Sequence, residues 1–375
     1  MAEGRWSSLE SAVINSLRKF RDRYFQIATK NETTEGNSDQ EKITRTCYLD
    51  SLPVDIQFYV MSFLTPQDLC QLGSTSQYWS SAVRDPVLWK YFLLRDIPSW
   101  SSIDCTSLPD LATLHKPLHE STESYPDFMA EYLRCYPASR RRSRPLRPRY
   151  RAVTSFFHSL VVNSEPCFAM FGPGLEQLDV SYVRKMMTSP DVLPIAGFPQ
   201  RQINGVGSGI SFRFNNQQTF NIITLYSETK KERERARLEQ HSVQSKLFLR
   251  EADSKAERST AKYTAMPHVQ EVCRVVNGFI YVANAEENGG ADREEELAQI
   301  QAMIDPAWGP STRPLLVLSC ISREGCRRIP CVNMAEQLHL KQLPNPWLVQ
   351  DSEAESLNGF LNGIEWLLGE IGINV

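Results

Sequence analysis

Apolar residues recur at helical spacing between residues 49 and 96. Ile56, Val60 and Leu64 follow one another in steps of four, behind Pro53, which suits the first turn of a helix because it has no N–H to pair there. Thr65 and the proline after it end this stripe and open a second helix. A third amphipathic piece carries the aromatic and aliphatic residues Tyr78, Trp79, Val83, Leu88 and Trp89. The pattern therefore predicts a bundle of short helices.

Such a bundle is too small to bury all of its large apolar residues, so we expect a partner to cover one face. The predicted docking residues are Leu52, Pro53, Ile56, Val60, Leu64 and Leu69. The order and spacing of these residues resemble the F-box. The resemblance implies docking onto the small adaptor of SCF ubiquitin ligases and, through it, onto cullin and RING subunits. The alternative interpretation is an ordinary helical core segment.

Before the bundle, residues 9–28 show a second helical pattern. One side of the predicted helix is apolar, with Leu9, Val13, Leu17, Phe20 and Tyr24. Two interpretations stay open, because an amphipathic helix needs some surface to cover it. The helix either packs on its own domain or joins two copies of the chain into a homodimer. Residues 29–46 are polar and predict a flexible link.

After the bundle, residues 97–139 are punctuated by prolines, and residues 140–151 hold seven arginines. Arginines of this density can contact phosphates. The run is short, however, and contains two prolines and only one aromatic residue. We interpret it as a solvated connector and expect no nucleic-acid binding.

From residue 152 the pattern changes to strands that alternate with helices. Short apolar runs predict strands at 167–171, 278–283, 315–320 and 347–350, and a hairpin is predicted from 210–214 and 220–226. Helices are predicted at 178–187, 293–303, 332–341 and 354–371. Strands joined by crossover helices predict a mostly parallel, doubly wound sheet. This order resembles the small GTPase fold, and residues 338–367 resemble the last strand and helix of its Arf-type branch.

A nucleotide site needs particular groups, and they are missing. Counted from Gly172, the positions that require glycine, lysine and a hydroxyl residue hold Gln177, Leu178 and Asp179. No glycine occurs between Gly209 and Gly278, so the D-x-x-G motif is absent, and residues 319–322 read Ser-Cys-Ile-Ser instead of the guanine-reading motif. We therefore expect no nucleotide. A degenerate GTP-binding regulatory protein is the alternative.

Composition narrows the function further. The chain has 375 residues, of which 41% are hydrophobic and 23% charged, with a net charge of −3, so no overall field favours nucleic acid or an anionic membrane. No apolar run reaches the length of a membrane span, and the sequence begins without a signal-peptide core. Nine cysteines, an odd number without a framework spacing, predict reduced thiols in the cytosol or nucleus. The cysteines form no C-x-x-C pair, and the six histidines have no metal-binding spacing. We expect no metal, no cofactor, no catalytic residue and no RING module of its own.

An F-box followed by a GTPase-like domain without nucleotide motifs resembles one kind of F-box substrate receptor over nearly the whole chain. Residues 68–79, 168–176 and 359–368 carry this match. The resemblance implies the substrate-recognition subunit of an SCF ligase, a non-enzymatic role that promotes degradation of its targets. It also implies telomeric-repeat-binding factor and D-type cyclin as targets, and thus roles in telomere maintenance and the cell cycle.

Four segments follow from this interpretation. They are an amphipathic helix with a flexible segment at 1–46, the F-box at 47–96, a linker with short helices and the arginine run at 97–151, and the GTPase-like target-binding domain at 152–375. The target surface has two candidates. One is the hairpin strand at 210–214, as a sheet edge, and the other is the helix with Cys331, Ala335 and Leu338 on one face. The resemblance favours the helix, although its face can also simply pack on the sheet.

Overall fold

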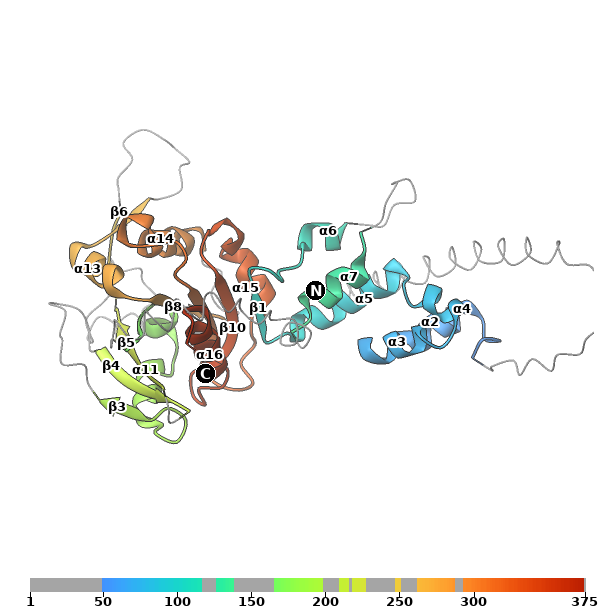
Figure 1. Cartoon of the computed structure of the whole chain (residues 1–375), viewed down its shortest axis with the longest axis horizontal. Helices are drawn as coiled ribbons and strands as arrows, with labels where there is room; N and C mark the ends of the chain where they lie inside the picture. Colours follow the sequence, from blue (N-terminus) through green and yellow to red (C-terminus); the bar gives the residue numbers. More distant parts are fainter. Residues whose placement is uncertain are drawn as a thin grey trace, which may run out of the picture. The chain divides into compact units, whose positions relative to one another are not determined.

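The computed structural model describes residues 49–116, 126–137, 165–197, 209–215, 218–226, 247–250, 262–286 and 293–373 (Figure 1). The chain divides into two compact units. The helical unit holds the described residues up to Asp96 and those from Asp110 to Leu133, and the sheet unit holds Ile97–Pro109 and the described residues from Arg134 onward. The predicted self-association residues lie outside the described residues, as does the arginine run.

The helical unit contains α2 (Val54–Ser62), α3 (Pro66–Gly73), α4 (Gln77–Ala82), α5 (Pro86–Asp96) and α6 (Leu111–His115), and α7 (Phe128–Cys135) begins in it. Its helices begin where the sequence offers caps. The Thr65 hydroxyl accepts a hydrogen bond from the Asp68 N–H, and the Asp68 carboxylate accepts one from the Thr65 N–H, which is a capping box. The Ser76 hydroxyl accepts the Trp79 N–H at the start of α4.

The predicted third helix is two helices, so the prediction of one continuous piece was wrong. The Asp85 carboxylate accepts the N–H of Val87 at 2.8 Å, and Pro86 is the first residue of α5. An aspartate cap followed by proline is a strong start signal for a new helix. The chain therefore turns between α4 and α5.

Aromatic side chains form the core of the helical unit. The rings of Trp89 and Tyr132 meet edge to face at 5.3 Å between centroids, and both lie beside Phe92. The Tyr132 hydroxyl donates to Asp96 at 2.7 Å, and Arg95 pairs with the same carboxylate at 2.6 Å. The hydroxyl group of the buried Tyr132 thus has a hydrogen-bond partner, so this large side chain can lie in the interior.

The sheet unit is built on eight described strands in the order β1-β10-β9-β8-β2-β5-β4-β3 (Figure 1). Strands β10, β9, β8, β2 and β5 run parallel, and β1 and β4 run antiparallel to their neighbours. The strands are β1 (Ser102–Asp104), β2 (Cys167–Phe171), β3 (Ile195–Gly197), β4 (Gly209–Phe214), β5 (Gln218–Thr224), β8 (Gly278–Asn284), β9 (Leu315–Ile321) and β10 (Trp347–Glu353). A separate pair is formed by β6 (Phe248–Arg250) and β7 (Tyr263–Ala265).

The predicted hairpin is confirmed as β4 and β5, which pair from Gly209 opposite Ile223 to Phe214 opposite Gln218. The prediction that its first strand forms the sheet edge was wrong. Strand β3 pairs with β4 on the other side, with Ile195 opposite Phe212. A three-residue strand is too short to show in the hydrophobic pattern. The outermost strands of the described sheet are therefore β1 and β3.

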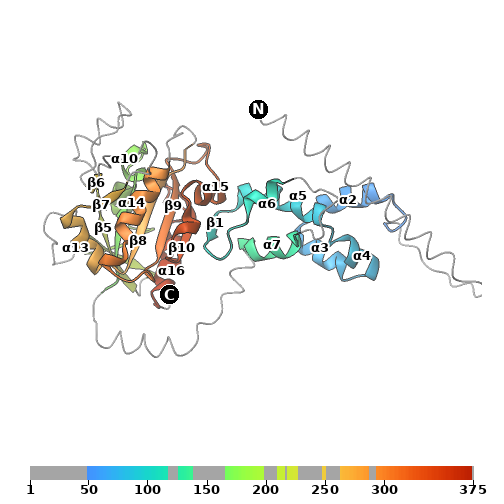
Figure 2. The same ribbon diagram turned by 90° about the horizontal axis from the view of Figure 1, so that it is seen from above.

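Helices cover both faces of the sheet, as predicted (Figure 2). Helices α11 (Tyr182–Thr188) and α16 (Phe360–Glu370) pack on one face in a single apolar cluster with alternate residues of the strands, such as Leu316 and Leu318. On the other face the Tyr281 hydroxyl donates to Glu296 of α14 (Glu294–Ile304) at 2.6 Å. The remaining helices are α10 (Gly174–Gln177), α13 (Pro267–Val275) and α15 (Cys331–Gln337), with short 3-10 turns η1 (Ile97–Ser99), η2 (Pro306–Trp308) and η3 (Leu340–Gln342).

Burial explains why these strands form. Every residue of β9 is buried, as are six of the seven residues of β8, which is typical of central parallel strands that are covered on both faces. A mostly parallel sheet with helices on both faces is thus shown, and the likeness to a small GTPase stays a prediction. None of the helices within the described ranges is long and apolar enough to cross a membrane.

Candidate adaptor and target surfaces

The entry to α2 is held in place by Gln57, which is buried. Its side-chain amide donates to the carbonyl oxygens of Leu49 and Leu52, each at 3.1 Å, and its amide oxygen accepts the Tyr78 hydroxyl at 2.5 Å. The Trp79 indole N–H donates to Asp50 at 2.8 Å. These bonds fix residues 49–52 beside α2, so Leu52 and the exposed side of the helix form one surface.

That surface is apolar and largely exposed. Phe63 is 69% exposed, Tyr59 62% and Ile56 46%, and the rings of the first two meet edge to face at 4.9 Å. We call it the α2 surface; its described members are Leu52, Pro53, Ile56, Tyr59, Val60 and Phe63. Exposed aromatic residues in such a cluster mark a protein-binding surface.

Sequence reasoning found four of these residues and missed Tyr59 and Phe63. The two aromatics lie four positions apart and flank the predicted stripe, and this spacing was the available signal. Leu64 is half-buried, and Leu69 is fully buried. The prediction that Leu69 docks the adaptor was therefore wrong. Its side chain belongs to the core, as the one buried residue of α3.

The loop after β2 occupies the place where a phosphate loop is expected. Gly172 has a φ of +124°, and a Cβ there would lie 2.6 Å from the Val282 carbonyl oxygen. Leu175 and Leu178 are buried in the apolar cluster of the sheet. The loop thus packs directly on β8, and the position that needs a lysine for phosphate holds a core leucine.

Polar groups join the loops at the carboxyl ends of the parallel strands. The Ser322 N–H donates to the Glu286 carboxylate at 2.7 Å, and the Ser322 hydroxyl accepts the Asp179 N–H at 3.2 Å. In open α/β sheets this edge is where ligands bind. Here the chain's own groups bond to one another across it.

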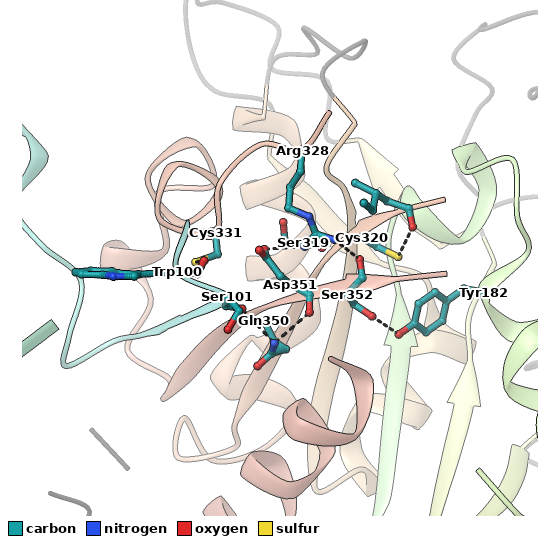
Figure 3. A network of polar contacts seen from close by, with 11 residues as sticks. Trp100, Ser101, Tyr182, Ser319, Cys320, Arg328, Cys331, Gln350, Asp351 and Ser352 are labelled. Carbon is teal, nitrogen blue, oxygen red and sulfur yellow. Dashed lines mark hydrogen bonds and ion pairs between the residues drawn. The ribbon is translucent and has the colours of Figure 1, made fainter. Parts of the chain in front are cut away.

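Arg328 and Asp351 form an ion pair near the carboxyl ends of β9 and β10 (Figure 3). One Arg328 nitrogen lies 3.0 Å from an Asp351 carboxylate oxygen, and another donates to the Ser352 carbonyl at 2.8 Å. Burial raises the pKa of Asp351 to about 6, and the Arg328 charge limits the rise. On the other face, Tyr182 and Ser352 share a hydrogen bond of 2.7 Å between their hydroxyls. The arginine thus ties the chain before α15 to the end of β10.

The predicted target residues lie on the inner face of α15. Cys331, Ala335 and Leu338 are each fully buried, and the Cys331 thiol donates to the Trp100 carbonyl oxygen at 3.0 Å. Helix α15 packs on β10, β1 and η1. The structure therefore corrects the expectation of an open docking face. The face packs on the chain's own residues, and Cys331 lies directly against the Trp100 carbonyl.

Among the described residues, no group of three or more His, Cys, Asp or Glu side chains is placed to hold a metal ion. The thiol pKa values of Cys167 and Cys273 are raised by burial, to about 11 and about 12, which disfavours the nucleophilic thiolate form at those two sites.

Comparison with known proteins agrees with this geometry. A family model described as F-box-like matches residues 49–95, the stretch that contains α2, α3, α4 and all of α5 except its last residue. The chain therefore contains an F-box and is an F-box protein. It is 52% identical over 367 residues to F-box only protein 4 of Homo sapiens, and equally to that of Mus musculus, with 98% of this chain and 94% of each relative covered. The Bos taurus protein of the same name is 51% identical over the same length. The chain belongs to the F-box only protein 4 family.

Proposed function

We propose that this protein is the substrate-recognition subunit of an SCF ubiquitin ligase. The helical unit binds the small adaptor through the α2 surface, and the adaptor brings cullin and RING subunits. The sheet unit binds the target. The observation that carries the proposal is the exposed apolar α2 surface, which lies within the F-box-like match.

The α2 surface suits such a partner for a physical reason. Two large side chains of this surface, Phe63 and Tyr59, are exposed although their unit has a well-packed aromatic core. Their burial against an apolar partner is favourable by about 1.5–3 kcal/mol for each fully buried side chain. Interfaces are commonly dominated by a few central aromatic anchors of this kind.

Ubiquitin transfer then depends on proximity. The target's lysine is held near the charged conjugating enzyme, and this protein supplies no reacting group. Family resemblance names telomeric-repeat-binding factor and D-type cyclin as targets, in the cytosol or nucleus. Because Cys331, Ala335 and Leu338 are fully buried within the sheet unit, we assign target binding to the sheet unit as a whole.

Affinity purification of the tagged full-length chain, read by mass spectrometry, tests this function. The wild type should capture the adaptor with cullin and RING subunits. The variant Ile56→Asp should lose all three together and still capture its targets, because a charge in the α2 surface disfavours apolar docking. The matched control is Val275→Asp, an exposed residue of the sheet unit that is 56% accessible. If the wild type captures no adaptor, or Ile56→Asp captures as much as the control, the proposal is wrong.

A further inference from the structure

The turn before α2 carries part of the α2 surface but has little structure of its own. Residues 49–53 form neither a helix nor a strand, and the Leu52 N–H reaches the Leu49 carbonyl oxygen at 3.3 Å. Leu52 and Pro53 are nevertheless exposed members of the α2 surface. Exposed side chains on such a turn keep one position only when other parts of the protein order its backbone.

Gln57 orders this backbone from the buried side of α2. Its side-chain nitrogen lies 3.1 Å from the carbonyl oxygens of Leu49 and Leu52 and 3.3 Å from that of Asp50. The two N–H bonds of one amide group are thus shared among three carbonyl groups of the turn. Because Gln57 is only 2% exposed, it acts on the turn and has almost no surface with which to contact a partner.

Helix α4 in turn fixes Gln57. The Tyr78 hydroxyl donates to the Gln57 amide oxygen at 2.5 Å, which leaves the amide nitrogen directed at the turn. The next residue, Trp79, donates its indole N–H to the Asp50 carboxylate at 2.8 Å. Both polar ends of the buried amide are therefore bonded, and such a satisfied network favours a single arrangement of the chain. We call Gln57 and Tyr78 the entry clamp.

The other end of α2 is held by a different residue. Arg95 of α5 donates to the Ser62 carbonyl oxygen at 2.8 Å, and an ion pair of 2.6 Å with Asp96 fixes its guanidinium group. Ser62 is the last residue of α2, and Phe63 of the α2 surface follows it. Loss of the entry clamp should therefore loosen Leu52 at one end of the surface and leave Phe63 at the other end in place.

We propose that Gln57 and Tyr78 are positioning residues for adaptor binding, which hold Leu52 and Pro53 in the docked arrangement before the adaptor arrives. The proposal rests on the SCF function and deepens it, because it assigns part of the affinity to residues that lie behind the docking surface. The reason is entropic. A turn that is already ordered loses little freedom on docking, whereas a loosened turn must be immobilised by the partner, which lowers the affinity.

Hydrogen exchange on the free full-length chain tests the clamp without any adaptor. In Tyr78→Phe, which removes a single oxygen atom, the Leu52 amide should exchange at least about tenfold faster than in the wild type. The Leu64 amide, bonded to the Met61 carbonyl at 3.1 Å near the end of α2, should keep its rate. Equal Leu52 rates in the two proteins would overturn the proposal, because the turn would then be ordered without the clamp.

Calorimetric titration of the SCF adaptor into the full-length chain measures the consequence for binding. Gln57→Leu should weaken binding about tenfold and Tyr78→Phe about threefold, although neither variant changes a residue of the α2 surface. The matched control is Tyr132→Phe, which also loses a tyrosine hydrogen bond, to Asp96 in the core of the helical unit. This control should bind as the wild type does. Clamp variants that bind as tightly as the control would contradict the proposal.

A double-mutant cycle separates positioning from a general loss of folded protein. If the clamp acts through Leu52, Gln57→Leu should weaken binding by less than about threefold in a Leu52→Ala background, and by the full tenfold or so in a Phe63→Ala background. The same loss in both backgrounds would indicate a merely structural role and overturn the proposal. Absence of binding by the wild type would contradict the SCF function and this proposal with it, whereas wild-type binding with an unaffected Gln57→Leu variant contradicts the clamp alone.

Discussion

At the scale of single residues, the half-buried carboxyl group of Asp351 is expected to make the stability of the sheet unit depend on pH. Its pKa is raised to about 6 by burial, against about 4 for an aspartate in an unfolded chain. The folded state therefore binds a proton before the unfolded state does as the pH falls. This contribution to stability is fully present below pH 4 and is lost as the pH rises through 6.

The first prediction compares the wild type with Asp351→Asn. The free energy of unfolding of the sheet unit, measured by chemical denaturation, should gain on the order of 2 kcal/mol in the wild type relative to the variant between pH 7.5 and pH 4.5. The variant has no carboxyl group at this position to titrate. Parallel pH profiles of the two proteins would show that this carboxyl group is not the cause.

A second prediction separates two apolar residues of the F-box that sequence cannot tell apart. Leu69 is fully buried and Phe63 is 69% exposed. Leu69→Ala should lower the free energy of unfolding of the helical unit by about 2–5 kcal/mol, because it leaves a cavity. Phe63→Ala should change it by less than about 0.5 kcal/mol. Similar losses in chemical denaturation of both variants would refute the assignment of core and surface.

At the level of elements, α15 packs on β10, β1 and η1, and Cys331 and Ala335 on its inner face are fully buried. Ala335→Arg should lower the melting temperature of the sheet unit strongly, because a charge without a partner is forced into a buried face. Asn333→Arg is the matched control, since Asn333 is exposed on the same helix. A melting temperature that holds in Ala335→Arg would instead show that this face is open in solution.

The elements also show which parts of the fold can be predicted from the sequence. The long buried strands β8 and β9 were predicted nearly to the residue, because continuous apolar runs leave few alternatives. Strands β1 and β3 have three residues each and leave no periodic signal. Helix α2 is apolar nearly all round, with Phe58 and Met61 buried and Tyr59 exposed, so its pattern could not say which side meets the core. Burial of the α15 face depends on residues more than 200 positions away, which no local pattern contains.

At the scale of the whole molecule, we expect this protein not to bind the nucleotide that α/β sheets often bind. The full-length protein should show no saturable heat of binding for GTP or GDP with Mg²⁺ in calorimetry. Leu175 and Leu178 are buried in the core where a phosphate loop would need polar groups. The loop also lies close against β8, because a Cβ atom added at Gly174 would be only 2.8 Å from the Val282 side chain. A one-to-one binding curve at micromolar nucleotide would revive the alternative of a GTP-binding regulator.

The central claim is that this chain joins a ubiquitin ligase through the α2 surface. Calorimetric titration of the purified SCF adaptor into the full-length protein tests it most directly. We predict saturable one-to-one binding, weakened about 30-fold by Phe63→Ala, since loss of an aromatic anchor of an interface costs about 2 kcal/mol. Leu249→Ala, at a residue 52% exposed in the sheet unit, should leave the affinity unchanged. No binding by the wild type, or equal affinity for both variants, would contradict the account.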